Sequence, residues 1–181
     1  DLVPIEQKTV YINSLDFNDV SLSRATGDFS AASLDLTMQY EQTLHGVCNS
    51  VLELAGKKKT LLFAASVHHA ERMAEIFNRH EPGNAYVVHG KTPPDHRREV
   101  LRRFEEGKFQ FLSNCMVATE GYDCPGIEMV VVAAPTRSRI RYSQQIGRGT
   151  RPLTGAIEGC ETAEDRRRAI AASDKPCLTV L

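Results

Sequence analysis

Short apolar runs alternate with amphipathic segments along most of the chain, and this alternation restricts its fold more than any other feature. The runs have the length and composition of buried strands, and they lie at residues 60–66, 85–90, 109–115, 127–135 and 177–181. Between the first two runs, Val67, Ala70, Met73 and Phe77 recur at the spacing of one helix face. Strands that alternate with helices form parallel sheets through right-handed crossovers. The sequence therefore predicts an α/β fold with a mainly parallel, helix-covered sheet.

The first 29 residues show little sustained periodicity. One strand is expected there, at Lys8–Ser14, in a segment whose composition is otherwise that of a connector from an N-terminal domain. The domain itself is expected to span residues 30–181. Asp28 or Ser30 is the candidate cap of its first helical region, and Thr92 that of a later helix.

Composition excludes several classes of protein. The formal net charge is −1, so a nucleic acid would bind a local basic surface and not a cationic protein as a whole. No apolar run approaches the ~20 residues that cross a bilayer, and the first residues form neither a signal nor a transit peptide, so we expect a cytoplasmic protein without a membrane partner. The five cysteines are odd in number and lack a C-x-x-C spacing, which disfavours disulfides and zinc.

Ligands of open parallel sheets bind at the carboxyl ends of the strands. The residues that follow the expected strands are Ser66, His89–Lys91, Cys115–Asp123 and Pro135–Arg139, and we expect them to share one edge. The segment HGKT, residues 89–92, resembles the end of a phosphate-binding loop. The glycine that such a loop requires five residues earlier is Ala85, and no acidic D-E-x-H strand end occurs. Direct nucleotide binding through HGKT is therefore a weak alternative.

The segment QQIGRGTRP, residues 144–152, holds two arginines three residues apart beside two glycines. Glycine costs a helix interior about 1 kcal/mol relative to alanine, which indicates that the backbone approaches something closely. Arg148 and Arg151 can face the same way and bind one phosphate. An arginine supplied from outside a nucleotide pocket accelerates phosphoryl transfer by ~10³ to 10⁵. A basic surface pair at the end of a helix is the simpler alternative.

The order of these motifs resembles the second RecA-like motor domain of superfamily-two helicases and translocases. The similarity covers residues 60–152, with motif IV at residues 61–77, the following helix at 88–107, motif V at 118–126 and motif VI at 144–151. TEGYDCP, PTRSR and QIGRGTRP are particularly similar to the bacterial and phage DEAD/DEAH-type branch, which includes restriction-enzyme motors. The resemblance implies a RecA-like three-layer sandwich with helices on both faces of the sheet.

The resemblance implies that Arg148 and Arg151 are arginine fingers, which reach the γ-phosphate of ATP bound by the N-terminal RecA-like domain of the same chain. Gln144 would help to position nucleotide or water. ATP and Mg²⁺ would be held mainly by that N-terminal domain, so this chain alone is expected to be inactive as an ATPase. The implied nucleotide contacts of this chain are Gly121, Asp123 and Gly147, of which Asp123 would meet the ribose.

The resemblance also implies nucleic acid as a partner, with DNA expected in preference to RNA. Arg97 matches an arginine that contacts the sugar-phosphate backbone. Ser66, His89 and Gly90 lie at strand ends, where a hydroxyl and backbone amides would add contacts. Many relatives have a phosphate-binding threonine at the position of Cys115, and Thr119 stands one helical turn later, so the choice between these two residues stays open.

The leading alternative from another class of protein is a non-catalytic nucleic-acid-binding or regulatory module that keeps the motor fold. The presence of Arg148, Arg151, Gln144 and Asp123 argues against such a module, because it would not need these residues.

Overall fold

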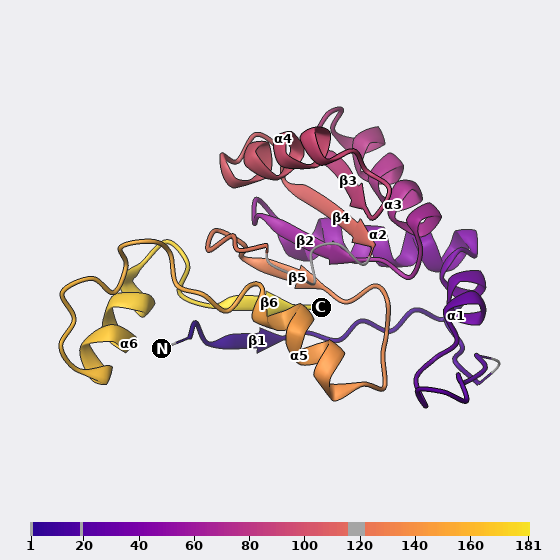
Figure 1. Ribbon diagram of the computed structural model, residues 1–181, viewed down its shortest axis with the longest axis horizontal. Coiled ribbons are helices and arrows are strands. Elements are labelled where there is room, and N and C mark those ends of the chain that lie inside the picture. Colours follow the sequence, from indigo (N-terminus) through magenta and orange to yellow (C-terminus); the bar gives the residue numbers. More distant parts are fainter. Residues whose placement is uncertain (1, 19, 116–121) are drawn as a thin grey trace.

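The computed structural model describes residues 2–18, 20–115 and 122–181 (Figure 1). Within these residues, one sheet has the order β1-β6-β5-β2-β4-β3, and every neighbouring pair of strands is parallel. The strands are β1 (Ile5–Gln7), β2 (Thr60–Phe63), β3 (Ala85–His89), β4 (Phe111–Cys115), β5 (Met129–Val131) and β6 (Leu178–Val180). The helices are α1 (Ala31–Met38), α2 (Glu41–Ala55), α3 (Val67–His80), α4 (Pro94–Glu105), α5 (Arg139–Gly147) and α6 (Ala163–Ala172). The predicted parallel α/β fold is confirmed.

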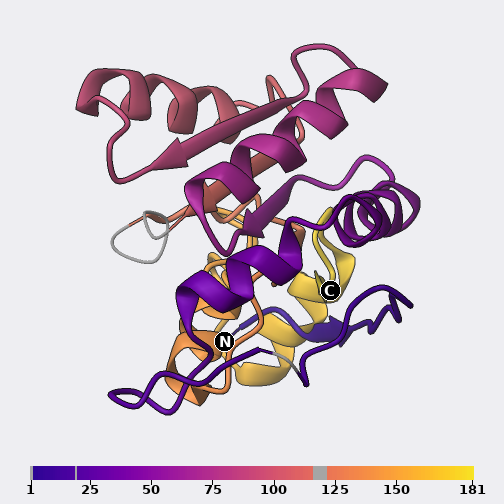
Figure 2. The same ribbon diagram turned by 90° about the vertical axis from the view of Figure 1, so that its right-hand side faces the viewer.

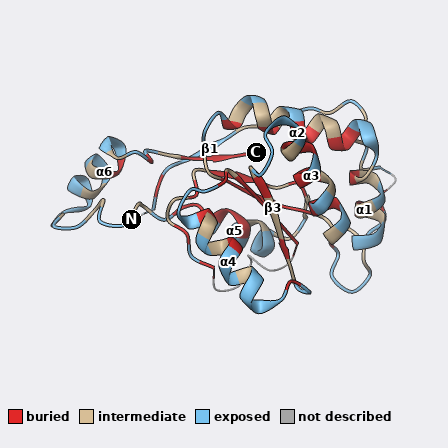
Figure 3. Ribbon diagram, turned by 90° about the horizontal axis from the view of Figure 1, so that it is seen from above, coloured by how far each residue is buried: buried red, intermediate tan, exposed pale blue. Residues whose placement is uncertain are grey.

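Helices cover both faces of the sheet (Figures 1 and 2). Two apolar cores lie between the helices and the sheet. Helices α1, α2 and α3 pack on one face, and α4, α5 and α6 contribute to the core on the other. Leu62 belongs to the first core and its neighbour Leu61 to the second, as the alternation of side chains along a strand requires. Strands β2, β4, β5 and β6 are therefore buried between the two helix layers (Figure 3). This is the three-layer RecA-like arrangement.

The prediction of a strand at Lys8–Ser14 is wrong, because the chain joins the sheet before Lys8. Ile5–Gln7 forms β1, beside β6, and the pairing ends where β6 ends, with the Lys8 amide donating to the Val180 carbonyl over 2.7 Å. After Lys8, no strand of the described residues pairs with this part of the chain, and Ile12 packs as irregular chain against the first core. Part of the expected connector is thus an edge strand of the sheet. That residues 1–29 connect the chain to a preceding N-terminal domain stays a prediction.

Two helix starts also differ from expectation. The first helical region is divided, because Tyr40 leaves the helical conformation (φ −56°, ψ 130°) between α1 and α2. Ser30 is the N-cap residue of α1, but its side chain makes no capping hydrogen bond. Pro93 precedes α4, while the Thr92 hydroxyl accepts a hydrogen bond from the His89 amide over 3.0 Å. Thr92 therefore closes a turn after β3 and does not cap the helix.

The sheet has a carboxyl edge, where its strands end, and an amino edge, where they begin. Lys59 and Glu128 directly precede β2 and β5, and their backbones are hydrogen-bonded at the amino edge. Helix α5 starts after β5 and runs back across the sheet, so the residues that follow it reach the amino edge. The Val3 amide, just before β1, donates to the Thr150 carbonyl there over 2.8 Å. The arginines of residues 144–152 therefore lie at the amino edge.

Candidate functional site

Arg148 and Arg151 both turn toward one short segment, Tyr122–Asp123. Arg148 ends α5 and donates from Nη1 to the Tyr122 carbonyl over 3.0 Å. Arg151 forms a hydrogen-bonded ion pair with the Asp123 carboxylate, across a sequence separation of 28 residues. The Arg151 and Asp123 side chains are 61% and 45% exposed, so a ligand can reach both groups. The structure thus brings together three residues that the sequence selects.

The loop of the two arginines is held against the sheet by Gly149. A Cβ atom there would lie 2.9 Å from Leu178 Cδ2 and 3.1 Å from Val130 Cγ2, closer than side chains tolerate. At Gly147, by contrast, no described atom outside its chain neighbours and its own helix backbone lies within 4 Å of the position that a Cβ would take. Gly149 therefore supplies the close approach within the protein, while Gly147 leaves open space on the surface. The role of Gly147 toward a nucleotide stays a prediction.

Gln144 and its neighbour Gln145 lie in different environments on α5. Gln144 is exposed, whereas Gln145 is buried. Gln145 lines a cavity of about 500 Å³ at the carboxyl edge, together with Asp28, Asn114 and Arg141. In the sequence, only their positions on the turn of the helix indicate which of the two glutamines is buried. The catalytic role of Gln144 stays a prediction.

Most of the expected nucleic-acid contacts gather at the carboxyl edge. Ser66 follows β2 and caps α3, where its Oγ accepts from the His69 amide over 3.0 Å. His89 ends β3, Gly90 follows it, and Cys115 ends the neighbouring β4. Burial raises the pKa of the Cys115 thiol, which argues against a nucleophilic role. The expected contacts Thr119 and Gly121 lie outside the described residues.

Arg97 folds back onto the turn that follows β3. Its Nη2 donates to the carbonyls of His89, Gly90 and Thr92 over 3.5, 3.4 and 3.1 Å. In this arrangement the guanidinium group stabilises the turn. A phosphate that approaches the turn would compete with these carbonyls for the N–H donors of Arg97, because the hydrogen bonds of 3.4 and 3.5 Å are long and weak.

The expectation that Cys115–Asp123 shares one edge with the other loops is wrong. Cys115 lies at the carboxyl edge, whereas Asp123 lies with the arginines toward the amino edge. The physical reason is that a connection between parallel strands must return to the opposite edge before the next strand begins. Asp123 belongs to the end of that return, just before β5. The candidate site is therefore two regions on opposite edges of one rigid sheet.

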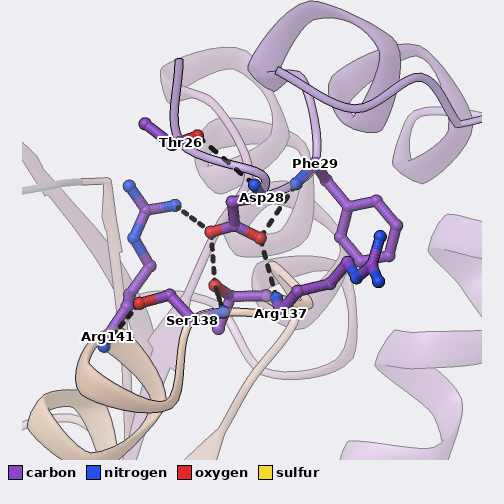
Figure 4. A network of polar contacts seen from close by, with 7 residues as sticks. Thr26, Asp28, Phe29, Arg137, Ser138 and Arg141 are labelled. Carbon is purple, nitrogen blue, oxygen red and sulfur yellow. Dashed lines mark hydrogen bonds and ion pairs between the residues drawn. The ribbon is translucent and has the colours of Figure 1, made fainter. Parts of the chain in front are cut away.

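Asp28 is a buried carboxylate that joins the first segment of the chain to the loop before α5 (Figure 4). It accepts hydrogen bonds from the amides of Phe29 and Arg137 over 2.8 and 2.7 Å and from the Thr136 hydroxyl, and it pairs with Arg141 over 3.4 Å. Burial alone would raise the pKa of Asp28, but these hydrogen bonds hold the pKa below its ordinary value. Asp28 thus fixes a loop instead of capping a helix.

Lys175 is a second buried charged residue without a sequence motif. Its ammonium group is buried and donates to the carbonyls of Pro125 and Arg151. In the sequence it is an ordinary lysine before the last apolar run, and no spacing marks it.

The two arginines and the carboxylate fit a nucleotide, because guanidinium groups bind phosphates and a carboxylate accepts from ribose hydroxyls. They do not fit Mg²⁺. In residues 2–18, 20–115 and 122–181, no three histidine, cysteine, aspartate or glutamate side chains are grouped as a metal site would require. Among the helices of these residues, none combines the length and apolar character needed to cross a membrane.

Residues 42–152, more than half of the chain, match the family described as the helicase conserved C-terminal domain. The chain belongs to this family. Its fold is similar to that of the C-terminal domain of the DEAD-box protein Dbp5, with a TM-score of 0.51 and 17% identity over 74% of this chain and 67% of that one. The resemblance seen in the sequence is confirmed.

Relatives of known name agree with this assignment. The chain is 30% identical over 139 residues to IRC3 of Saccharomyces cerevisiae, named as an ATP-dependent helicase, and 31% identical over 141 residues to a 51.5 kDa protein of a Lactococcus phage. The matches cover 75% and 76% of this chain but only 20% and 30% of those relatives. A fragment described as the HsdR subunit of a type I restriction enzyme from Vibrio vulnificus has the same fold, with a TM-score of 0.58 and 18% identity over 99% of this chain and 31% of that one.

Proposed function

We propose that this chain is the C-terminal motor half of an ATP-dependent nucleic-acid helicase or translocase of the cytoplasm. In this proposal, ATP and Mg²⁺ are held mainly by an N-terminal RecA-like domain of the same protein. Arg148 and Arg151 are donated to the γ-phosphate as arginine fingers, with Gln144 and Gly147 beside them. Asp123, with Gly121, contacts the ribose.

The observation that supports the proposal best is the convergence of Arg148 and Arg151 on the Tyr122–Asp123 segment. Two arginines and a carboxylate, remote in sequence, form one accessible cluster. A pair of arginines at the end of a helix, with no function, would not need a partner segment that carries an accessible carboxylate.

The energies also suit an exchange of partners. An exposed ion pair such as Asp123–Arg151 contributes about 0–1 kcal/mol. An arginine finger worth ~10³ to 10⁵ in rate contributes on the order of 4 to 7 kcal/mol in the transition state. Arg151 can therefore leave Asp123 at little cost when a phosphate is presented.

The nucleic acid is bound in this proposal at the carboxyl edge. The contacts come from Ser66, His89, Gly90, Arg97 and from Cys115 or Thr119. Because both edges belong to one sheet, closure on ATP at the amino edge moves the nucleic-acid grip as a rigid body. Contacts to phosphates carry little sequence information, so the motor is sequence-tolerant and salt-sensitive, and DNA is the proposed strand.

The experiment compares ATP turnover in the protein that joins this chain to its N-terminal RecA-like domain. Arg148→Ala and Arg151→Ala should each lower kcat by about 10²-fold or more without loss of folding. Arg168→Ala is the matched control, because Arg168 is an exposed arginine paired with Glu164 on α6, and its kcat should not change. Normal turnover in both finger variants, with nucleic-acid binding intact, would favour the non-catalytic module. The 181-residue chain alone should not hydrolyse ATP.

A further inference from the structure

Lys175 lies in the loop that leads into β6 and is almost completely buried, with a relative exposure of 1%. Lysine is rarely buried to this extent, because its ammonium group loses hydration in the interior. Burial lowers the pKa of Lys175 to about 8, although the nearby Cys124, Glu128 and Asp123 act in the opposite direction. A side chain that is so costly to bury requires compensating contacts.

Two backbone carbonyls from separate segments provide the compensation. Lys175 Nζ donates to the Pro125 carbonyl over 2.6 Å and to the Arg151 carbonyl over 2.7 Å. Hydrogen bonds from a charged donor are short and about twice as strong as neutral ones. Pro125 follows Asp123 by two residues, and Arg151 is itself one of the two arginines. One ammonium group therefore fixes the backbones of both segments.

Three contacts thus join the same pair of segments, namely the Arg148–Tyr122 hydrogen bond, the Asp123–Arg151 ion pair and the paired hydrogen bonds of Lys175. The last two, an outer and an inner link, differ in their environment. The outer link is the Asp123–Arg151 ion pair, which is exposed and screened by salt. The inner link is Lys175, which water does not reach. When Arg151 turns to a phosphate, the outer link is lost and the inner link remains.

We propose that Lys175 is a positioning residue, which keeps Asp123 and Arg151 in register while Arg151 exchanges its carboxylate partner for a phosphate. This role rests on the finger function proposed for Arg151. Lys175 touches neither nucleotide nor reacting atoms in this scheme. It acts on turnover only through Arg151 and the segment of Asp123.

A double-mutant cycle tests this role in the protein that includes the N-terminal RecA-like domain. Lys175→Met keeps the length of the side chain and removes the ammonium group. Alone, it should lower kcat for ATP by about tenfold, and in the Arg151→Ala background it should change kcat by less than about twofold. Additive losses would overturn the role, because a general structural defect acts independently of Arg151.

The same cycle separates this role from the finger function. Normal turnover in Arg151→Ala would reject the finger function, and the role of Lys175 with it. A large loss in Arg151→Ala together with normal turnover in Lys175→Met would overturn the role of Lys175 alone. Lys58→Met is the matched control, since Lys58 Nζ donates to Thr179 Oγ1 in β6 over 3.0 Å and, among the described residues, forms no hydrogen bond or ion pair with either segment. Its kcat should be unchanged.

Hydrogen exchange provides a second readout. Lys175→Met should accelerate amide exchange in residues 122–127 and 149–153, while β2 and β4 keep their protection. If Lys175→Met does not fold, Lys175→Gln, which retains a shorter amide donor, replaces it in both experiments. Uniformly faster exchange, or failure of both variants to fold, would overturn the proposal, because Lys175 would then be required for folding in general.

Discussion

The imidazole of His69 accepts a hydrogen bond at Nδ1 from the backbone amide of Ala65, 3.2 Å away. His69 is completely buried in the first turns of α3. Burial lowers the pKa of His69 to about 4, more than the neighbouring Asp35 raises it. The imidazole is therefore neutral in the folded protein at neutral pH.

This neutrality predicts a pH-dependent stability. Between pH 6.5 and 4 the unfolded chain binds a proton at His69 that the folded chain does not bind, so the free energy of unfolding falls as the pH decreases through this window. The full effect is about 3 kcal/mol. Urea unfolding of the chain from pH 7.5 to 4.5 should show this slope, and His69→Asn should reduce it.

His80→Asn is the matched control, because His80 is an exposed residue at the end of the same helix. This variant should retain the wild-type slope. A slope that is the same in His69→Asn and in the unmodified chain would show that His69 does not carry the pH dependence.

The two glycines of the arginine loop should respond differently to alanine. Gly149→Ala would place a methyl group against Leu178 and Val130, and overpacking of this kind costs about 1–3 kcal/mol. In Gly147→Ala the methyl group meets no described atom within 4 Å outside its chain neighbours and its own helix backbone, and the free energy of unfolding should change by less than about 0.5 kcal/mol. Urea unfolding of both variants measures the difference. Equal destabilisation by the two alanines would contradict the close packing of Gly149.

Arg97 provides a test of the carboxyl edge in nucleic-acid binding. In the protein with its N-terminal RecA-like domain, Arg97→Ala should weaken binding evenly across sequences and reduce the salt slope of log Kd by about 1, as the loss of one phosphate contact requires. Arg98→Ala is the control, since Arg98 is exposed on the same helix and paired with Asp95. Equal losses in both variants would indicate a diffuse basic surface and not a specific contact by Arg97.

The apolar runs identify the strands of the sheet well where burial alone decides, as at β2 and β4, whose residues are all buried. β1 is different, because all its residues are exposed and its limits depend on the partner β6. A pattern within one segment cannot reveal that dependence. The strand expected at Lys8–Ser14 was therefore misplaced.

The candidate site shows the same division. Arg148, Arg151 and Asp123 could be selected from their motifs, but their meeting at the amino edge depends on the return path from β4 to β5. Asp28 could be selected only as a candidate helix cap, and Lys175 could not be found, because a single buried charge has no periodicity or spacing in the sequence. Their partners come from loops that are remote along the chain.

The placement of β1 beside β6 has a mechanical consequence. The chain enters β1 at the amino edge and leaves β6 at the carboxyl edge, so the two ends of these neighbouring strands point in opposite directions (Figure 1). Traction on the termini would load the hydrogen bonds between β1 and β6, including Leu178 to Pro4 at 2.8 Å, in shear and all at once. When the protein is pulled by its ends, the pairing of β1 and β6 should therefore resist rupture far better than a pair of strands whose hydrogen bonds break one after another.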